Sequence, residues 1–193
     1  MIQKKFSIYS VLILIVFYFL CIAEYNLSFA QNSNSKLSME NTLYLKLKNG
    51  LVVIEMLPKL APNHVERIKQ LVKTKFYDNT PIHRVIEGFM AQMGDPTGTG
   101  GGGSDLPDLN EEFSSEPHVR GIVSMARTPD PDSANSQFFI MFDSAPSLDG
   151  QYTVWGRVIE GMEFVDLIKK GSGRDGIVKN PDKIITLRLG TKK

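Results

Sequence analysis

Cysteine is almost absent from this 193-residue sequence, because the one thiol belongs to Cys21, inside an apolar stretch near the N-terminus. The rest of the chain therefore excludes an internal disulfide and catalysis by a thiolate. Three histidines (His64, His83 and His118) are present, but no HxxxH, HExxH or CxxC pattern gives them the spacing of a metal site. We expect no metal site.

The sequence also lacks an excess of charge of either sign. Lys and Arg total 22, and Asp and Glu total 21, which leaves a formal net charge of +1. A protein that binds nucleic acid usually carries a strongly basic face, so no nucleic-acid partner is expected. The hydrophobic fraction of 42% and the charged fraction of 22% are those of a soluble globular protein.

Several catalytic motifs are missing. No serine lies in the G-x-S-x-G pattern of a hydrolase, and the GK[ST] of a phosphate-binding loop is absent. Residues 98–103 satisfy G-x-G-x-x-G, but no apolar helix follows and Pro107 comes soon after, which argues against a dinucleotide site. We predict a flexible or tightly turning loop there. The adjacent carboxylates Glu111 and Glu112 are typical of a solvated face, and no cofactor is expected.

Residues 1–30 have the anatomy of a secretory signal peptide. A cationic start (MIQKK) precedes the uncharged run 6–23, and Ser28 and Ala30 occupy the small positions preferred before a cleavage site. The uncharged run is also long enough for an uncleaved membrane anchor. Either alternative puts the body outside the cytoplasm, so we expect it to be periplasmic or secreted, or membrane-anchored and facing the periplasm.

Residues 31–41 are polar, with Ser and Asn repeated, and this composition is typical of a flexible linker. The remaining residues, 42–193, have the length of one domain. No internal repeat is visible in them.

The domain begins with a strong hairpin signal. Alternating runs at 42–48 and 51–57 flank Asn49 and Gly50. Asn-Gly favours a two-residue turn because both residues tolerate a positive φ. We predict a β-hairpin with its turn at these two residues.

The other apolar runs predict further strands and two helices. Pro62 opens a segment whose apolar positions recur at helical spacing to about Lys75, and a shorter helical pattern covers 162–169. Eight short strands and two helices indicate a mainly-β domain, closed or sandwiched, with helices over its open ends. The strand-like runs after the hairpin are 82–86, 89–93, 121–126, 137–142, 153–159 and 184–189.

Three polar side chains, Arg84, Gln92 and Gln137, interrupt runs that otherwise have the character of buried strands. A buried arginine or glutamine must be paired or must line a cavity that a ligand fills. The alternative is that these side chains point to solvent. Phe138 and Phe139 are neighbours on a strand and face opposite ways, so either one could simply belong to the core.

Four stretches resemble the signatures of one family. They read IHRVIEGFMAQMGD (82–95), GIVSMA (121–126), SQFFI (136–140) and LDGQYTVWGRVIEGM (148–162). In this order and spacing they are similar to the cyclophilins, the peptidyl-prolyl cis-trans isomerases, over about residues 43–189.

The resemblance implies a closed eight-stranded antiparallel barrel capped by two α-helices. It also implies a monomeric isomerase without a cofactor or metal, whose substrates are proline-containing polypeptides. An exported member would act on exported proteins during folding, and would contact a membrane only through an uncleaved N-terminal segment. The motifs make Arg84 the catalytic arginine, assisted by Gln92 and Phe89. The implied substrate-binding residues are Met90, Met125, Ala126, Arg127, Gln137, Phe139, Leu148 and Tyr152.

A proline-peptide binding module or holdase without turnover is the alternative function. Retention of Arg84 argues against it, because binding alone does not require a hydrogen-bond donor to the proline nitrogen.

The sequence departs from the best-known eukaryotic members of the family at three positions. Ser147 stands where they carry a tryptophan, Tyr152 where they carry a histidine, and Arg127 where they carry an asparagine. Trp155 belongs to the following predicted strand and does not replace the missing tryptophan.

Cyclosporin is therefore expected to bind weakly, because no indole is available to stack on the drug or to donate a hydrogen bond to it. Calorimetric titration measures the dissociation constant directly. A sub-micromolar value would contradict this expectation.

Overall fold

The computed structural model describes Tyr18 and residues 39–190. The chain divides into two units, Met1–Ser38 and Met39–Lys193, and the fold below belongs to the second. Apart from Tyr18, the predicted signal peptide or anchor (1–30) lies outside the described residues, as does most of the predicted linker (31–41). In the part of the chain that is described, no helix is both long enough and apolar enough to cross a membrane.

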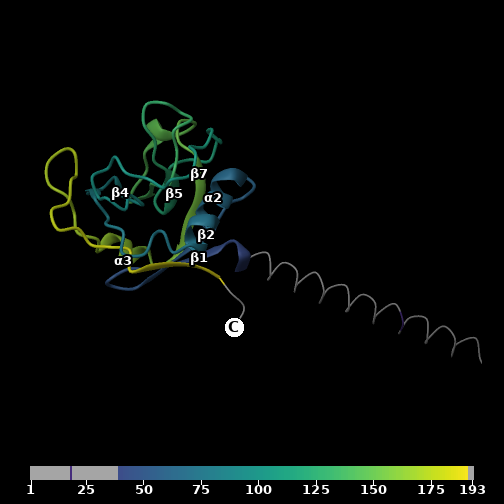
Figure 1. Ribbon diagram of the computed structural model, residues 1–193, viewed down its shortest axis with the longest axis horizontal. Helices are drawn as coiled ribbons and strands as arrows, with labels where there is room; N and C mark the ends of the chain where they lie inside the picture. Colours follow the sequence, from purple (N-terminus) through teal and green to yellow (C-terminus); the bar gives the residue numbers. More distant parts are fainter. Residues whose placement is uncertain (1–17, 19–38, 191–193) are drawn as a thin grey trace, which may run out of the picture. The chain divides into compact units, whose positions relative to one another are not determined.

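One antiparallel sheet dominates the described residues (Figure 1). Its strands are β1 (Thr42–Lys46), β2 (Leu51–Met56), β3 (Arg84–Ile86), β4 (Met90–Met93), β5 (Ile122–Met125), β6 (Phe138–Met141), β7 (Val154–Glu160) and β8 (Thr186–Leu189). They pair in the order β3-β4-β6-β5-β7-β2-β1-β8. Helix α2 (Pro62–Lys73) contacts β7 and β8, and helix α3 (Met162–Asp166) contacts β2.

The predicted hairpin is confirmed, but its turn differs from the prediction. Strands β1 and β2 pair from Thr42 with Glu55 to Lys46 with Leu51. The Leu47 N–H donates to the Gly50 oxygen at 2.9 Å, and neither residue 49 nor residue 50 has a positive φ. A β-carbon on Gly50 would overlap the Phe164 ring. Glycine is therefore needed here for the close approach of α3, and not for the turn conformation.

Helix α2 begins at Pro62 as predicted and ends two residues earlier than expected. Lys75 adopts a left-handed φ of 59°. The N–H groups of Lys75 and Phe76 then donate to the carbonyls of Val72 and Leu71, both at 3.0 Å. This is the hydrogen-bond pattern that terminates many helices, with lysine in the place that glycine usually takes. Helix α3 is likewise shorter than the predicted 162–169.

The predicted closure of the barrel is wrong, because the sheet is an open half-barrel. Its edge strands β3 and β8 do not pair with each other. Residues 171–185 run beside β3 and the residues just before it, joined by isolated bridges such as Arg84 with Ile177 and Pro81 with Lys183. Three glycines and a proline interrupt this segment, and neither residue type sustains a strand.

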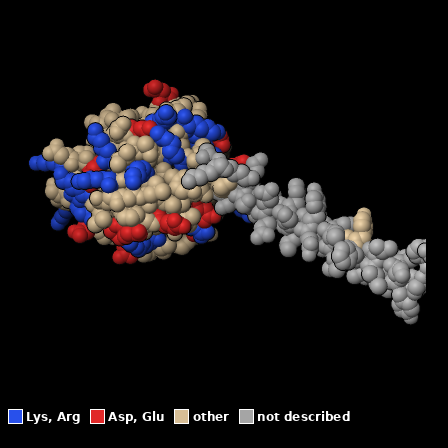
Figure 2. Space-filling model, turned by 90° about the horizontal axis from the view of Figure 1, so that it is seen from below, with Lys and Arg blue, Asp and Glu red and all other residues tan. Residues whose placement is uncertain are grey.

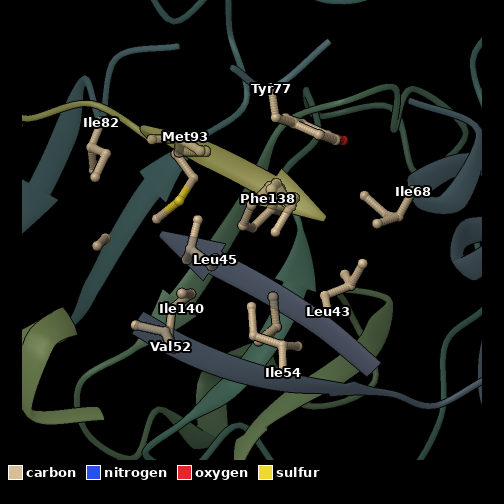
Figure 3. Close-up of a cluster of buried hydrophobic side chains, with 14 of the residues drawn as sticks. Leu43, Leu45, Val52, Ile54, Ile68, Tyr77, Ile82, Met93, Phe138 and Ile140 are labelled. Atoms are coloured by element: carbon tan, nitrogen blue, oxygen red, sulfur yellow. The ribbon is translucent and has the colours of Figure 1, made fainter. Parts of the chain in front are cut away.

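The central strands carry two apolar clusters, one on each face. Alternate residues point to opposite faces of a strand, so Phe138 enters the main cluster and Phe139 the smaller one. The main cluster also holds Trp155 and the apolar face of α2, and Figure 3 shows strand residues converging there around Phe138. The smaller cluster consists of Met90, Ile122, Phe139, Met141 and Val154.

The surface drawn in Figure 2 carries side chains of both charges, with Asp and Glu on the same face as Lys and Arg. This agrees with the near balance of 22 basic and 21 acidic residues in the sequence.

Candidate active site

The smaller cluster borders a cavity of about 170 Å³ on the face of the sheet opposite the main cluster. This cavity brings together residues from four separate stretches of the chain, and all of them are predicted site residues. Met125 and Gln137 are the two predicted residues that do not line it. The lining residues are Arg84, Phe89, Met90, Gln92, Ala126, Arg127, Phe139, Leu148 and Tyr152.

Phe139 provides the apolar wall of the cavity. It is 5% exposed, and its ring meets Tyr152 edge-on at a centroid distance of 5.6 Å. The Phe139 ring also stacks on the His118 ring, with a centroid distance of 6.2 Å. Aromatic contacts of this kind hold a ring in one orientation. The wall is therefore preformed before a ligand enters.

Arg84 stands on the wall of this cavity, opposite Gln92 in the β3–β4 pairing. Its Nε donates to the Asp175 carbonyl at 3.0 Å, and its Nη1 donates to Gln92 Oε1 at 3.1 Å. Nη1 also lies 3.9 Å from the Met90 sulfur. Among the described residues, Arg84 forms no ion pair and its Nη2 has no hydrogen-bond partner. Two N–H donors therefore remain for a ligand.

Two glutamine side chains connect Arg84 to the glycine-rich loop. Gln92 Nε2 donates to Gln137 Oε1 at 2.8 Å. Gln137 Nε2 in turn donates to the carbonyls of Gly100 and Gly102, at 2.9 and 2.8 Å. Because the Gln92 amide nitrogen donates to Gln137, the Gln92 amide oxygen faces the guanidinium of Arg84. Gln137, predicted to bind substrate, thus acts on Arg84 through Gln92.

Asp95 holds the glycine-rich loop in a tight turn. This fully buried carboxylate accepts hydrogen bonds from the N–H groups of Thr97, Gly100 and Gly102, and from the Thr97 hydroxyl, at 2.7–3.2 Å. Burial by itself would raise the pKa of Asp95, but these hydrogen bonds outweigh it and lower the pKa to about 2. Sequence reasoning missed this anchor, although an aspartate before Pro-Thr-Gly is a turn signal.

A second, larger cavity of about 320 Å³ adjoins the first. The two share Gln92, Ala126 and Arg127 in their walls. The Ala126 N–H donates to the Gln137 carbonyl at 2.9 Å, so a backbone contact from residue 126 to a ligand has to come from its carbonyl oxygen. The rest of the larger cavity is lined mainly by Gly100–Gly103 and polar side chains from residues 104–137.

The structure does not bring Met125 to the site, which corrects its predicted role in substrate binding. Its side chain is 1% exposed and belongs to the main cluster, with Val123 of the same strand. The motif identified β5 correctly, but the alternation of the strand turns Met125 inward.

His118, Asp149 and Ser124 form a hydrogen-bonded group behind the cavity that sequence reasoning missed. Asp149 Oδ1 accepts the His118 backbone N–H at 2.7 Å and lies 3.0 Å from His118 Nδ1, while Ser124 Oγ lies 2.9 Å from His118 Nε2. Burial lowers the pKa of His118. Ser124 is fully buried, so its hydroxyl cannot reach a substrate as a nucleophile. The group instead supports Leu148, the neighbour of Asp149 in the chain.

In residues 39–190, no three His, Asp or Glu side chains come together in a way that could hold a metal ion.

Comparison with known proteins gives a consistent result. The family described as cyclophilin type peptidyl-prolyl cis-trans isomerase/CLD matches residues 42–189. A Brucella suis protein named "Probable peptidyl-prolyl cis-trans isomerase" is 56% identical over 167 residues, which covers 79% of this chain and 85% of that protein.

Solved structures are similar as well. The crystal structure of a cyclophilin from Hirschia baltica has a TM-score of 0.69 at 31% identity, covering 78% of this chain and 74% of that one. A Cryptosporidium parvum cyclophilin, crystallised in the presence of the dipeptide Ala-Pro, has a TM-score of 0.72 at 28% identity. The match covers 78% of this chain and 99% of the Cryptosporidium parvum chain.

Replacement of Asp95 by Asn should destabilise the domain in a pH-dependent way. A carboxyl group whose pKa is lower in the folded than in the unfolded protein stabilises the folded state when the pH is above the unfolded pKa. This stabilisation is lost as the pH falls toward the pKa in the folded protein, which is about 2. We expect Asp95→Asn to cost about 2 kcal/mol at pH 7, and the difference from wild type to shrink between about pH 4 and pH 2.

Urea unfolding across this pH range measures the difference. The control is Asp105→Asn, in the same loop, where the carboxylate is exposed. A constant difference between wild type and Asp95→Asn at every pH would refute the role of the charge.

Proposed function

This chain belongs to the cyclophilin family and is a peptidyl-prolyl cis-trans isomerase, and we propose that Arg84 and the apolar cavity beside it carry the activity. One observation supports this proposal above the others. The guanidinium of Arg84 is held by Gln92 and the Asp175 carbonyl, yet its Nη2 donors have no partner among the described residues and lie on the wall of a cavity lined by Phe139 and Met90.

The barrier that this site must lower is that of amide rotation. Partial double-bond character makes rotation about a peptide C–N bond cost ~18–20 kcal/mol. For an X–Pro bond the two planar isomers lie within ~1 kcal/mol of each other, but they exchange only over tens to hundreds of seconds. A catalyst therefore needs to stabilise the twisted state and neither planar one.

Arg84 would act on the proline nitrogen in the twisted state. Once conjugation is lost, the nitrogen becomes pyramidal and its lone pair can accept a hydrogen bond. The guanidinium is a permanent donor, and this hydrogen bond exists mainly in the transition state, which is the kind of interaction that raises kcat.

The hydrogen bond from Arg84 is not sufficient for a large acceleration. A charged hydrogen bond contributes ~1.5–3 kcal/mol, and each tenfold acceleration requires ~1.4 kcal/mol. The remainder would come from the apolar walls, which grip the proline ring and exclude water, so that the hydrogen bond forms in a medium of low polarity. A preformed wall at Phe139 avoids reorganisation during the reaction.

The cavity of about 170 Å³ suits a proline ring in size and in chemistry. The Cryptosporidium parvum cyclophilin was crystallised in the presence of Ala-Pro, which supports short proline-containing peptides as ligands of this kind of site. The adjoining cavity leaves room for the chain that flanks the proline. Gln92 and Ala126 line both cavities, and the Gln92 side chain and the Ala126 carbonyl oxygen would hold the substrate backbone.

We propose that the clients are exported proteins, in the periplasm or outside the cell, whose folding rate is limited by proline isomerisation. The support comes from residues 1–30, with a cationic start, a long uncharged run and small residues at 28 and 30.

Mass spectrometry of the N-terminus of the protein from its native host tests this export. Cleavage after Ala30 is expected. An intact N-terminus on protein recovered in the membrane fraction would favour the anchor, and an intact N-terminus on cytoplasmic protein would contradict export.

Arg84→Ala should reduce kcat/KM for a short X–Pro peptide by about two orders of magnitude, because one charged hydrogen bond to the transition state is lost. A protease-coupled assay measures turnover, and the melting temperature should change little. Near wild-type turnover would exclude the proposed role, and saturable peptide binding by wild type without turnover would favour a binding module.

Phe139→Ala is the matched control for this experiment. It removes part of the wall and leaves the guanidinium in place, so it should raise KM and lower kcat less than Arg84→Ala does, whereas Arg84→Ala should act mainly on kcat.

A further inference from the structure

A second arginine, Arg127, lines both cavities. It is half-buried and directly follows Ala126, which also belongs to both walls. A peptide that places its proline in the smaller cavity and extends into the larger one has to pass Arg127. The side chain is therefore positioned to contact the residues that flank the proline.

The guanidinium of Arg127 is fixed by uncharged groups. Nε and Nη2 donate to the Gln151 carbonyl at 3.1 and 2.9 Å, and Nη1 donates to the carbonyls of Thr128 and Pro129 at 2.8 and 3.2 Å. Its central carbon lies 4.7 Å from the ring centroid of Tyr152. These contacts leave one Nη2 hydrogen without a partner among the described residues. They also hold the group rigidly, which lowers the entropy lost on binding.

The positive charge of Arg127 is not neutralised within residues 39–190, where it forms no ion pair. Among the described residues, the smaller cavity is lined by two cations, Arg84 and Arg127, and by no carboxylate. The larger cavity adds one acidic residue, Asp108, whose Oδ1 accepts a hydrogen bond from Asn135 at 2.9 Å. The wall common to both cavities is thus positive. It favours a carboxylate over an ammonium group at the same place.

We propose that Arg127 is a specificity-determining residue, which makes the enzyme prefer X–Pro bonds flanked by Glu or Asp. This inference rests on the proposed function, because it assumes that the peptide occupies the two cavities. A purely structural role for Arg127, tying residues 128 and 129 to residue 151, would predict equal effects on all peptides. The charge of the substrate distinguishes the two roles.

The test compares matched peptides in two series, one with Glu, Gln or Lys before the proline and one with the same residues after it. Wild type is compared with Arg127→Gln, which removes the charge, and with Arg127→Lys, which keeps the charge without the planar fork. Arg157→Gln is the control, because Arg157 is exposed on β7 and pairs with Glu55 at 2.7 Å, away from both cavities. Each kcat/KM is measured at low salt and at about 0.5 M salt.

We expect wild type to favour Glu over Gln about threefold to fivefold at low salt in at least one series, and to disfavour Lys. High salt should reduce the ratio, because it screens exposed charges. The preference should vanish in Arg127→Gln, persist in part in Arg127→Lys and remain unchanged in Arg157→Gln.

Equal rates for Glu and Gln peptides in both series of wild type would overturn the inference, as would a preference that survives in Arg127→Gln. The Gln peptides separate this failure from failure of the proposed function, since their turnover does not depend on the charge. If no peptide is turned over, fluorescence anisotropy with labelled Glu and Gln peptides measures the same preference of Arg127 as a ratio of dissociation constants.

Discussion

The site depends on a line of hydrogen bonds that begins at a buried carboxylate and ends at a guanidinium. Asp95 fixes the glycine-rich loop, and the carbonyls of that loop orient the amide of Gln137. Gln137 orients Gln92, and Gln92 holds Arg84. An arginine side chain alone has many rotamers of similar energy, so its position must be set by neighbours. Here the neighbours use Nε and Nη1, and Nη2 has no partner among the described residues, so we propose that it serves the substrate.

The half-barrel supplies the second requirement, an apolar wall that does not belong to the core. Strand alternation sends Phe138 inward, where it packs on Trp155 and supports the fold, and sends Phe139 outward into the cavity. One short strand therefore contributes adjacent residues to the core and to the proposed binding cavity. A change at either phenylalanine can be assigned to one of the two roles, because the clusters that they enter are separate.

Patterns carried by neighbouring residues predicted much of this structure. The β1–β2 hairpin, the start of α2 at Pro62 and the strands that carry Arg84 and Phe139 all follow from local alternation, turn chemistry and the motifs. Features set by the backbone conformation of single residues, or by which face a strand turns to the core, were not predictable in this way. The left-handed conformation of Lys75 ends α2 early, and the irregular segment 171–185 leaves the barrel open. The side chain of Met125 in β5 points into the main cluster and therefore does not reach the site. Asp95 was missed although its partners Thr97, Gly100 and Gly102 are close in sequence, because a turn signal does not show which N–H groups the carboxylate accepts from.

The central claim is that Arg84 donates a hydrogen bond to the proline nitrogen in the twisted state. A peptide containing 4,4-difluoroproline tests it most directly, because fluorine withdraws electrons and weakens that nitrogen as an acceptor. The quantity to measure is the ratio of catalysed to uncatalysed isomerisation rates, by NMR exchange, for proline and difluoroproline peptides. We predict that fluorination lowers this ratio for wild type far more than for Arg84→Ala. An equal decrease in both proteins, or no decrease in wild type, would contradict the claim.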